Sequence, residues 1–267
     1  MNNAANTRLS RTERRDLQRH DKPYLSQPLH MGGDPRSMAA HLRHLVQALR
    51  SPTSKSPSSD AVAHIGALHD RTVPKQMEKM LACRKGCSHC CSQMVVVTAP
   101  EAFYVAEQLR KRPATAAAVA DVAREAGNLT LEERLGKNIF CPLLSDAICS
   151  IYAARPLGCR GFVSTNLEAC IAAFTRGETP NIPMPNDSIS VLYACRMLLL
   201  AALRLAGLRD GVYEMNSAVA VALSAPDAEA QWLAGKNLFA GLQETPPPPP
   251  QFEASIRQMM AFVAPTI

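Results

Sequence analysis

Apolar side chains recur every three or four residues along most of the chain, which is the spacing of amphipathic helices. Thr98 and Glu101 have the spacing of a capping box, and Asp187 and Gly207 are suited to begin and end a long apolar helix. The pattern predicts helices over residues 38–49, 61–81 with a break near Pro74, 98–111, 113–126, 165–175, 187–206, 213–223, 226–234 and 252–263. We therefore expect a mainly α fold.

Three segments depart from the helical pattern. Residues 94–97 are a short β-branched run, and residues 246–250 are consecutive prolines, which favour polyproline II. Residues 140–163 combine turn formers with short apolar runs, and a hairpin-like break there is expected to set Cys141 beside Cys149. The expected architecture is helices around an irregular, cysteine-rich centre with short strands.

The N-terminal part differs in composition from the rest. Residues 1–36 contain few apolar side chains, and residues 51–59 are a Ser/Pro linker. Residues 1–50 hold nine Lys/Arg against four Asp/Glu, so most of the net charge of +6 lies there. We predict a basic, largely disordered arm with its linker over residues 1–59, and a helical domain over residues 60–267.

A basic arm suits nucleic acid or an acidic partner. Tyr24 is the only aromatic residue among the first fifty, so stacking on bases has little support. No pair of histidines follows the cysteines at zinc-finger distance. We therefore expect no nucleic-acid partner, and the sequence identifies no protein partner.

The overall composition narrows the class of protein. A hydrophobic content of 47% and a charged content of 19% fit a folded chain, and nine cysteines in 267 residues are too few for a disulfide scaffold. The first residues do not form a signal peptide, and the most apolar segment, Ile189–Leu208, carries Arg196 and Arg204. We expect a cytoplasmic protein that does not enter a membrane and whose cysteines are thiols.

The first cysteine cluster holds four thiols within nine residues: Cys83, Cys87, Cys90 and Cys91. Zinc and iron–sulfur sites need several deprotonated sulfurs a few ångströms apart, and short spacing lets one loop supply them. Gly86 allows the sharp turn that folds the sulfurs inward, while Arg84 and Lys85 favour thiolate over thiol.

A second group of cysteines follows about fifty residues later. Arg155 and Arg160 lie among these cysteines and can offset thiolate charge or donate to sulfur. Cys195, in an apolar helix, is expected to be a small buried hydrophobe, and for Cys170 that role and ligation stay equally open. The candidate metal ligands are Cys83, Cys87, Cys90, Cys91, Cys141, Cys149, Cys159 and Cys170.

The motifs Cys83-x3-Cys87-x2-Cys90-Cys91, Cys141-Pro142-x-Leu144, Cys149-x-Ile151-Tyr152 and Arg155-Pro156-x2-Cys159-Arg160 occur in this order. In this respect the chain resembles the YkgJ-like cysteine-cluster proteins over roughly residues 80–175. That family is described as a zinc- or iron-chelating domain, so the resemblance implies a metal site built from both clusters. A relative of the domain occurs in the larger flagellin lysine methylases.

Metal binding is the expected function, with zinc, iron or a [4Fe–4S] cluster as the cofactor. Eight candidate thiols exceed the four that one tetrahedral zinc takes, so one centre with spare thiols and two metals both stay open. The alternative is a metal-dependent enzyme: a protein lysine methylase by resemblance, or a radical-S-adenosylmethionine enzyme by the spacing of the first three cysteines. No glycine-rich nucleotide loop supports the former, and few strand runs follow the motif of the latter.

Overall fold

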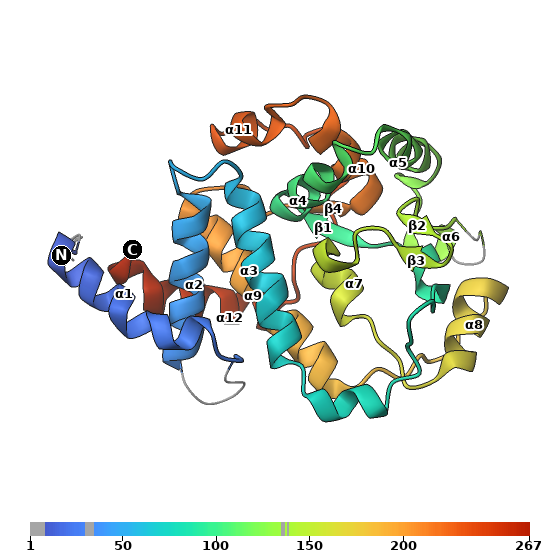
Figure 1. The fold of residues 1–267 in the computed structure, drawn as a ribbon, viewed down its shortest axis with the longest axis horizontal. Coiled ribbons are helices and arrows are strands. Elements are labelled where there is room, and N and C mark those ends of the chain that lie inside the picture. The colour runs from blue at the N-terminus through green and yellow to red at the C-terminus, as the bar shows by residue number, and fades with distance from the viewer. Residues whose placement is uncertain (1–8, 30–34, 135–136, 138) are drawn as a thin grey trace. The chain divides into compact units, whose positions relative to one another are not determined.

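The computed structural model describes residues 9–29, 35–134, 137 and 139–267. Over these residues the chain forms twelve α-helices, and its strands are only two or three residues long (Figure 1). The mainly α fold that the hydrophobic pattern predicts is therefore confirmed.

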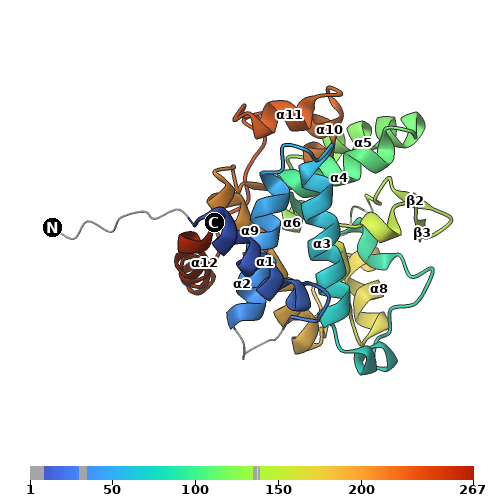
Figure 2. The same cartoon turned by 60° about the vertical axis from the view of Figure 1, so that its left-hand side comes forward.

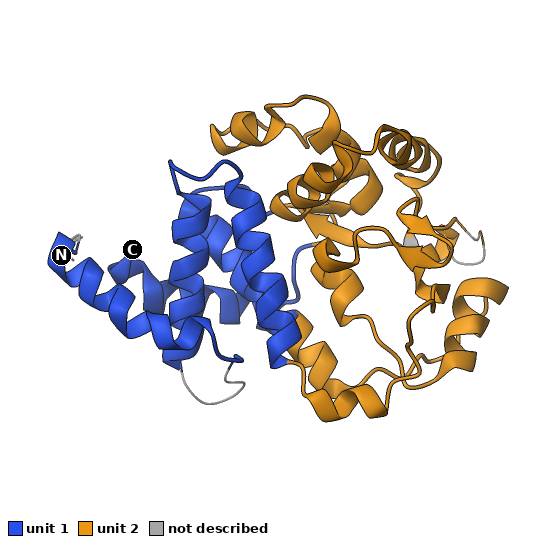
Figure 3. Ribbon diagram, viewed as in Figure 1, with its two compact units in different colours: residues 1–72, 193–210, 247–267 blue, residues 73–192, 211–246 orange. Residues whose placement is uncertain are grey.

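The chain divides into two compact units, coloured blue and orange in Figure 3. Unit 1 comprises residues 1–72, 193–210 and 247–267, and unit 2 comprises residues 73–192 and 211–246. All eight candidate metal ligands belong to unit 2.

Unit 1 is a group of helices around an aliphatic core. Its elements are α1 (Arg11–Leu25), α2 (Pro35–Leu49), α3 (Pro57–Thr72), most of α9 (Asn186–Ala206), α12 (Pro250–Val263) and the 3-10 turn η4 (Ala264–Thr266). Helix α2 packs against α1, α3 and α12, and Figure 2 shows α2 and α3 side by side. The apolar side chains of the two helices are buried: Leu42, Leu45, Val46 and Leu49 on α2, and Ile65 and Leu68 on α3.

Residues 11–25 form a helix in a stretch whose composition favours a disordered arm. Ser10 and Glu13 cap this helix reciprocally, at 2.7 Å and 3.2 Å. Asp21, only 7% exposed, accepts hydrogen bonds from Arg43 of α2: one from Nε at 2.6 Å and one from Nη2 at 2.5 Å. This buried ion pair fastens α1 to α2. Its partners are distant in sequence, so local composition does not reveal it.

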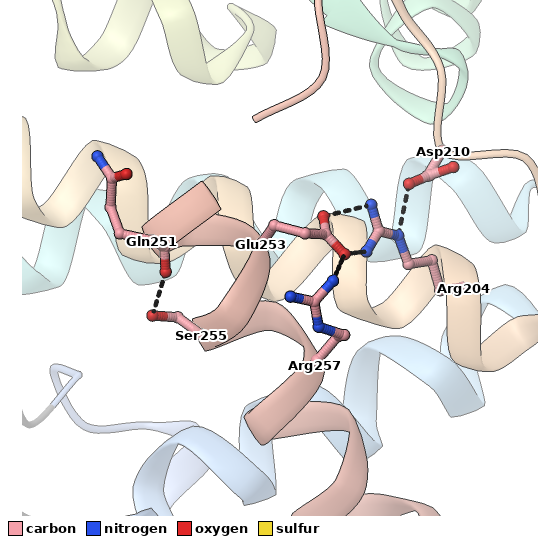
Figure 4. A network of polar contacts seen from close by, with 6 residues as sticks. All are labelled: Arg204, Asp210, Gln251, Glu253, Ser255 and Arg257. Atoms are coloured by element: carbon pink, nitrogen blue, oxygen red, sulfur yellow. Dashed lines mark hydrogen bonds and ion pairs between the residues drawn. The ribbon is translucent and has the colours of Figure 1, made fainter. Parts of the chain in front are cut away.

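The end of α9 is joined to α12 by a charged network (Figure 4). Arg204 donates to both carboxylate oxygens of Glu253, at 2.7 Å and 3.0 Å, and to Asp210 at 2.6 Å. Arg257 adds a hydrogen bond to Glu253 at 3.3 Å. The hydrogen bonds from Arg204 lower the pKa of Glu253, which keeps its carboxylate charged.

Unit 2 has short elements and long connections. Its elements are η1 (Lys75–Lys79), η2 (His89–Ser92), β1 (Val96–Thr98), α4 (Ala99–Leu109), α5 (Pro113–Ala126), α6 (Leu131–Arg134), β2 (Leu144–Ser145), β3 (Ile148–Cys149), η3 (Tyr152–Ala154), α7 (Leu157–Gly161), α8 (Leu167–Arg176), β4 (Val212–Glu214), α10 (Met215–Leu223) and α11 (Ala228–Leu233). Helix α10 packs against α4 and α5. Phe103 of α4 lies 5.6 Å from Trp232 and 5.7 Å from Phe239 between ring centroids, so aromatic rings complete this core.

Two antiparallel pairs of strands flank these helices. Strand β1 pairs with β4, with Val97 opposite Tyr213, and β2 pairs with β3. The helix expected over residues 213–223 therefore begins later, at Met215, because residues 212–214 pair with β1. Glu214 caps it by accepting a hydrogen bond from the backbone N–H of Ser217 at 2.8 Å.

Helix α9 is the one helix in the described part of the chain that is long and apolar enough to cross a membrane. Half of its most apolar stretch is buried inside the protein.

Candidate metal centre

The first cysteine loop turns sharply at Gly86. The backbone N–H of Cys87 donates to the carbonyl of Arg84 at 3.0 Å, and Gly86 has a φ of 86°. This is the left-handed conformation that glycine adopts without strain, as the sequence predicts. Cys83 stands at the start of the loop, where its sulfur accepts the backbone N–H of Ser164 at 3.4 Å.

The next two thiols lie on the 3-10 helix η2, which packs against α8. Ser92 is buried and donates from Oγ to the carbonyl of Phe174 at 3.3 Å, which holds η2 on that helix. Cys90 packs against a small core of Cys170, Ala173 and Phe174. The structure thus brings Cys170, the undecided residue of the sequence, next to the first cluster.

The hairpin expected in the second cluster is present. Strands β2 and β3 are joined by Asp146 and Ala147, which have φ values of 51° and 60°. In its register, however, Leu144 and not Cys141 lies opposite Cys149. Cys141 precedes the hairpin.

The hairpin is tied back to the first cluster through Cys141. Its backbone N–H donates to the carbonyl of Cys91 at 2.8 Å, and its own carbonyl accepts from Leu144 at 3.1 Å. The two clusters, fifty residues apart in sequence, therefore meet at Cys91 and Cys141.

Cys159 lies on the short helix α7, whose first turn is held by a buried carboxylate. Glu101 is 1% exposed, and its Oε1 accepts the backbone N–H of Leu157 at 2.9 Å. At the other end of α7, a Cβ on Gly161 would lie 2.7 Å from the Cβ of Leu192, so only glycine allows this close approach. These contacts fix the position of the short helix that carries Cys159.

All nine cysteines are free thiols. Seven of the candidate ligands are half-buried, Cys170 is buried, and Cys195 lies in the part of α9 that belongs to unit 1. Cys195 is thus buried outside the cysteine-rich segment, and burial raises its pKa to about 12.

Burial makes most of the candidate thiols resist ionisation. It raises the pKa of Cys141 to about 12, with a further contribution from the neighbouring Cys91 and Cys149. Burial is also the largest cause of the raised pKa values of Cys149, Cys159 and Cys170.

Cys90 and Cys91 share a hydrogen bond that raises the pKa of Cys90 and lowers the pKa of Cys91. A metal cation would offset the cost of ionising this group of thiols.

Arginine side chains act around the second cluster in different ways. The positive charge of Arg155 opposes the rise in the pKa of Cys149 and Cys159, which the sequence suggested. Arg160 instead binds backbone, donating from Nε to the carbonyl of Arg155 at 2.9 Å. Arg134, paired with the buried Glu214 at 3.2 Å, also opposes the rise in the pKa of Cys141.

Sequence reasoning missed Ser164, which contacts both Cys83 and Cys170. It also missed the contact of Glu101 with Leu157, although it found the capping box to which Glu101 belongs. The capping box has a sequence pattern, whereas neither tertiary contact has one.

Over the described residues, no group of three or more His, Cys, Asp or Glu side chains is already gathered at the spacing of a bound metal ion. Protonated thiols have no reason to converge, because a neutral S–H neither attracts nor ligates another. The donor set nonetheless suits zinc or iron, since it consists of soft sulfurs on short loops.

The comparison with protein families decides what this segment is. Residues 82–176 match the family model CxxCxxCC, described as a "Putative zinc- or iron-chelating domain". Residues 82–176 are therefore similar to this chelating domain. This confirms the resemblance to cysteine-cluster proteins, and all eight candidate ligands fall within the matched residues. No curated protein and no solved structure matches the chain.

Proposed function

We propose that the CxxCxxCC domain binds zinc or iron through thiolates of Cys83, Cys87, Cys90, Cys91, Cys141, Cys149, Cys159 and Cys170, and that the metal holds its loops folded. Each bound ion would neutralise sulfurs whose burial disfavours charge, and binding would release their protons. The chelating domain thereby becomes a structural centre of unit 2.

The observation that carries this proposal is that two thiol clusters meet where the backbone has little regular secondary structure. In residues 83–92 and 139–154, the only regular elements are η2, the β2–β3 hairpin and η3. A two-stranded hairpin is marginally stable by itself in water. A metal bound across both segments would cross-link them, and its binding free energy would add to that of folding.

A reaction is not part of the proposal. A radical-S-adenosylmethionine enzyme would have alternating strands and helices, whereas the strands described here form two separate two-stranded sheets. The family match names a chelating domain and supports no enzyme class, a lysine methylase included. Free thiols suit a reducing compartment, so we place the protein in the cytoplasm as part of the same proposal.

The test is metal analysis of the whole chain purified without oxygen, by mass spectrometry of metals, acid-labile sulfide assay and visible absorption. Zinc without sulfide, or iron with or without it, is the expected result, and chelation should lower the melting temperature. A folded protein that contains neither metal, and takes up neither when they are added, would overturn the proposal.

A further inference from the structure

The cysteine pair at the middle of the first cluster is the starting point. Cys90 and Cys91 are neighbours in the chain and lie on the 3-10 helix η2. Successive residues of a 3-10 helix are rotated by about 120°, because the helix has 3.0 residues per turn. The two side chains therefore leave the helix in different directions and have different surroundings.

Cys91 faces the second cluster. Its carbonyl accepts the backbone N–H of Cys141 at 2.8 Å, and Cys149 lies on the hairpin that follows Cys141. Cys159 lies on α7, which follows this hairpin in the chain after the 3-10 turn η3. We call Cys91, Cys141, Cys149 and Cys159 the hairpin set.

Cys90 faces α8 and its surroundings. It packs directly against the small core that contains Cys170. Ser164 hydrogen-bonds both to Cys83, at 3.4 Å, and to Cys170. Cys87 belongs to the same turn as Cys83, since its backbone N–H donates to the carbonyl of Arg84 at 3.0 Å. We call Cys83, Cys87, Cys90 and Cys170 the α8 set.

The two sets are adjacent around Cys90. Cys90 hydrogen-bonds Cys91, and the charge of Cys159 also acts on Cys90, so the sets are adjacent. Each set nevertheless has its own backbone frame: the hairpin and α7 for one, the Gly86 turn and α8 for the other. The number of thiols in each equals the number that one tetrahedral zinc, or one four-cysteine iron–sulfur cluster, requires.

We propose that the domain holds two separate metal centres, one in the hairpin set and one in the α8 set, with η2 as their shared support. This rests on the proposed function. In the simplest case each divalent ion binds four thiols and releases four protons, which leaves a complex with a charge of 2− and changes no oxidation state. Nearby cations can offset this negative charge. The charge of Arg155 acts on Cys149 and Cys159 of the hairpin set, and Arg84 and Lys85 lie in the loop of the α8 set.

Cys90→Ser and Cys91→Ser form a matched pair of variants, because the substitution is the same at neighbouring positions. We expect each to keep half of the wild-type metal per chain. Cys170→Ser should then behave like Cys90→Ser, and Cys149→Ser like Cys91→Ser. The double variant Cys149→Ser/Cys170→Ser should lose all metal, and Cys195→Ser should lose none.

A measurement on the unmutated chain guards against variants that fail to fold. The protein loaded with ¹¹³Cd²⁺ should bind two equivalents and give two cadmium resonances in the range of four-thiolate sites. One equivalent with one resonance, or complete metal loss in both Cys90→Ser and Cys91→Ser, would overturn the two-centre arrangement and leave metal binding intact. An unmutated chain that binds neither zinc, iron nor cadmium would overturn the proposed function itself.

Discussion

Glu101 joins two helices through its two carboxylate oxygens: Oε2 accepts the backbone N–H of Thr98 at the start of α4, and Oε1 accepts that of Leu157 at the start of α7. Both hydrogen bonds are 2.9 Å long, and the side chain is buried. Because α7 also carries Cys159, this carboxylate helps to position a candidate metal ligand although it is not one itself.

Replacing Glu101 with Ala should destabilise unit 2 and weaken metal binding. A buried hydrogen bond to a charged group contributes about 1.5–3 kcal/mol, and Glu101 makes at least one such bond that no other group replaces. Denaturant unfolding followed by circular dichroism measures the loss, and competition with a chelator measures metal affinity.

Glu133 provides the matched control for Glu101. It completes an equivalent capping box with Thr130 at the start of α6, but it is exposed and, among the described residues, hydrogen-bonds no second helix. Glu133→Ala should leave metal affinity unchanged and cost much less stability. Equal effects of the two substitutions would show that Glu101 only caps α4.

The contrast between these two carboxylates shows which contacts can be predicted from the sequence and which cannot. The spacing of Thr98 and Glu101 predicts the capping box, and apolar periodicity predicts α4 and α2. The second bond of Glu101 spans 56 residues and has no local pattern. Only the folded backbone brings Leu157 to it.

The same distinction applies to the cysteines and to α1. Spacing identifies the eight candidate thiols, but it does not assign them to the two proposed centres. Cys90 and Cys91 are adjacent in the sequence, and only their surroundings in the fold distinguish them. Asp21 is one of several charges in a basic stretch, and its buried partner Arg43 lies 22 residues away. Composition alone therefore favours disorder where the structure has a helix.

That ion pair gives a second prediction. Arg43→Ala leaves Asp21 buried without its partner, so unit 1 should lose about 3–5 kcal/mol of stability. Thermal unfolding of the variant measures the loss. Metal content should not change, because all candidate ligands lie in residues 82–176.

Arg19 and Asp16 make the comparison. They form an ion pair at 3.7 Å within α1 but are largely exposed, so Arg19→Ala should have little effect on stability. A small effect of Arg43→Ala, similar to that of Arg19→Ala, would argue that α1 is dispensable for the fold of unit 1.

We expect three histidines to make the stability of unit 1 depend on pH. His41 Nδ1 and His64 Nε2 lie 3.0 Å apart, and the His44 ring lies 4.2 Å from that of His64. Burial is the largest cause that lowers the pKa of all three, to about 4 for His41 and about 3 for His64. The positive charge of Arg71 further lowers the pKa values of His41 and His64.

Asp21 and Asp60 act in the opposite direction, on His41 and His44 respectively, but do not overcome burial. In the unfolded chain these imidazoles bind protons near pH 6.5, whereas the folded chain keeps them neutral. Stability should therefore be constant above about pH 6.5 and decrease as the pH is lowered from there toward about 4. His64→Gln should reduce this slope, and exposed His20→Gln should not. Urea unfolding at several pH values measures the slope, and an unchanged slope in His64→Gln would refute the assignment.

The last prediction separates a metal ligand from a buried bystander. Cys159→Ser should lower both metal content and the melting temperature, because structural zinc contributes about 10–16 kcal/mol in small peptides and one of four ligands is lost. Cys195→Ser should keep all of its metal. It places a hydroxyl in an apolar site of α9, so its cost should be about 1–3 kcal/mol and independent of metal. Calorimetry before and after chelation distinguishes the two: chelation should lower the melting temperature of Cys195→Ser as much as that of the unmutated chain, and that of Cys159→Ser by less. If both variants keep their metal and respond alike to chelation, Cys159 is not a ligand and the hairpin set has lost a member.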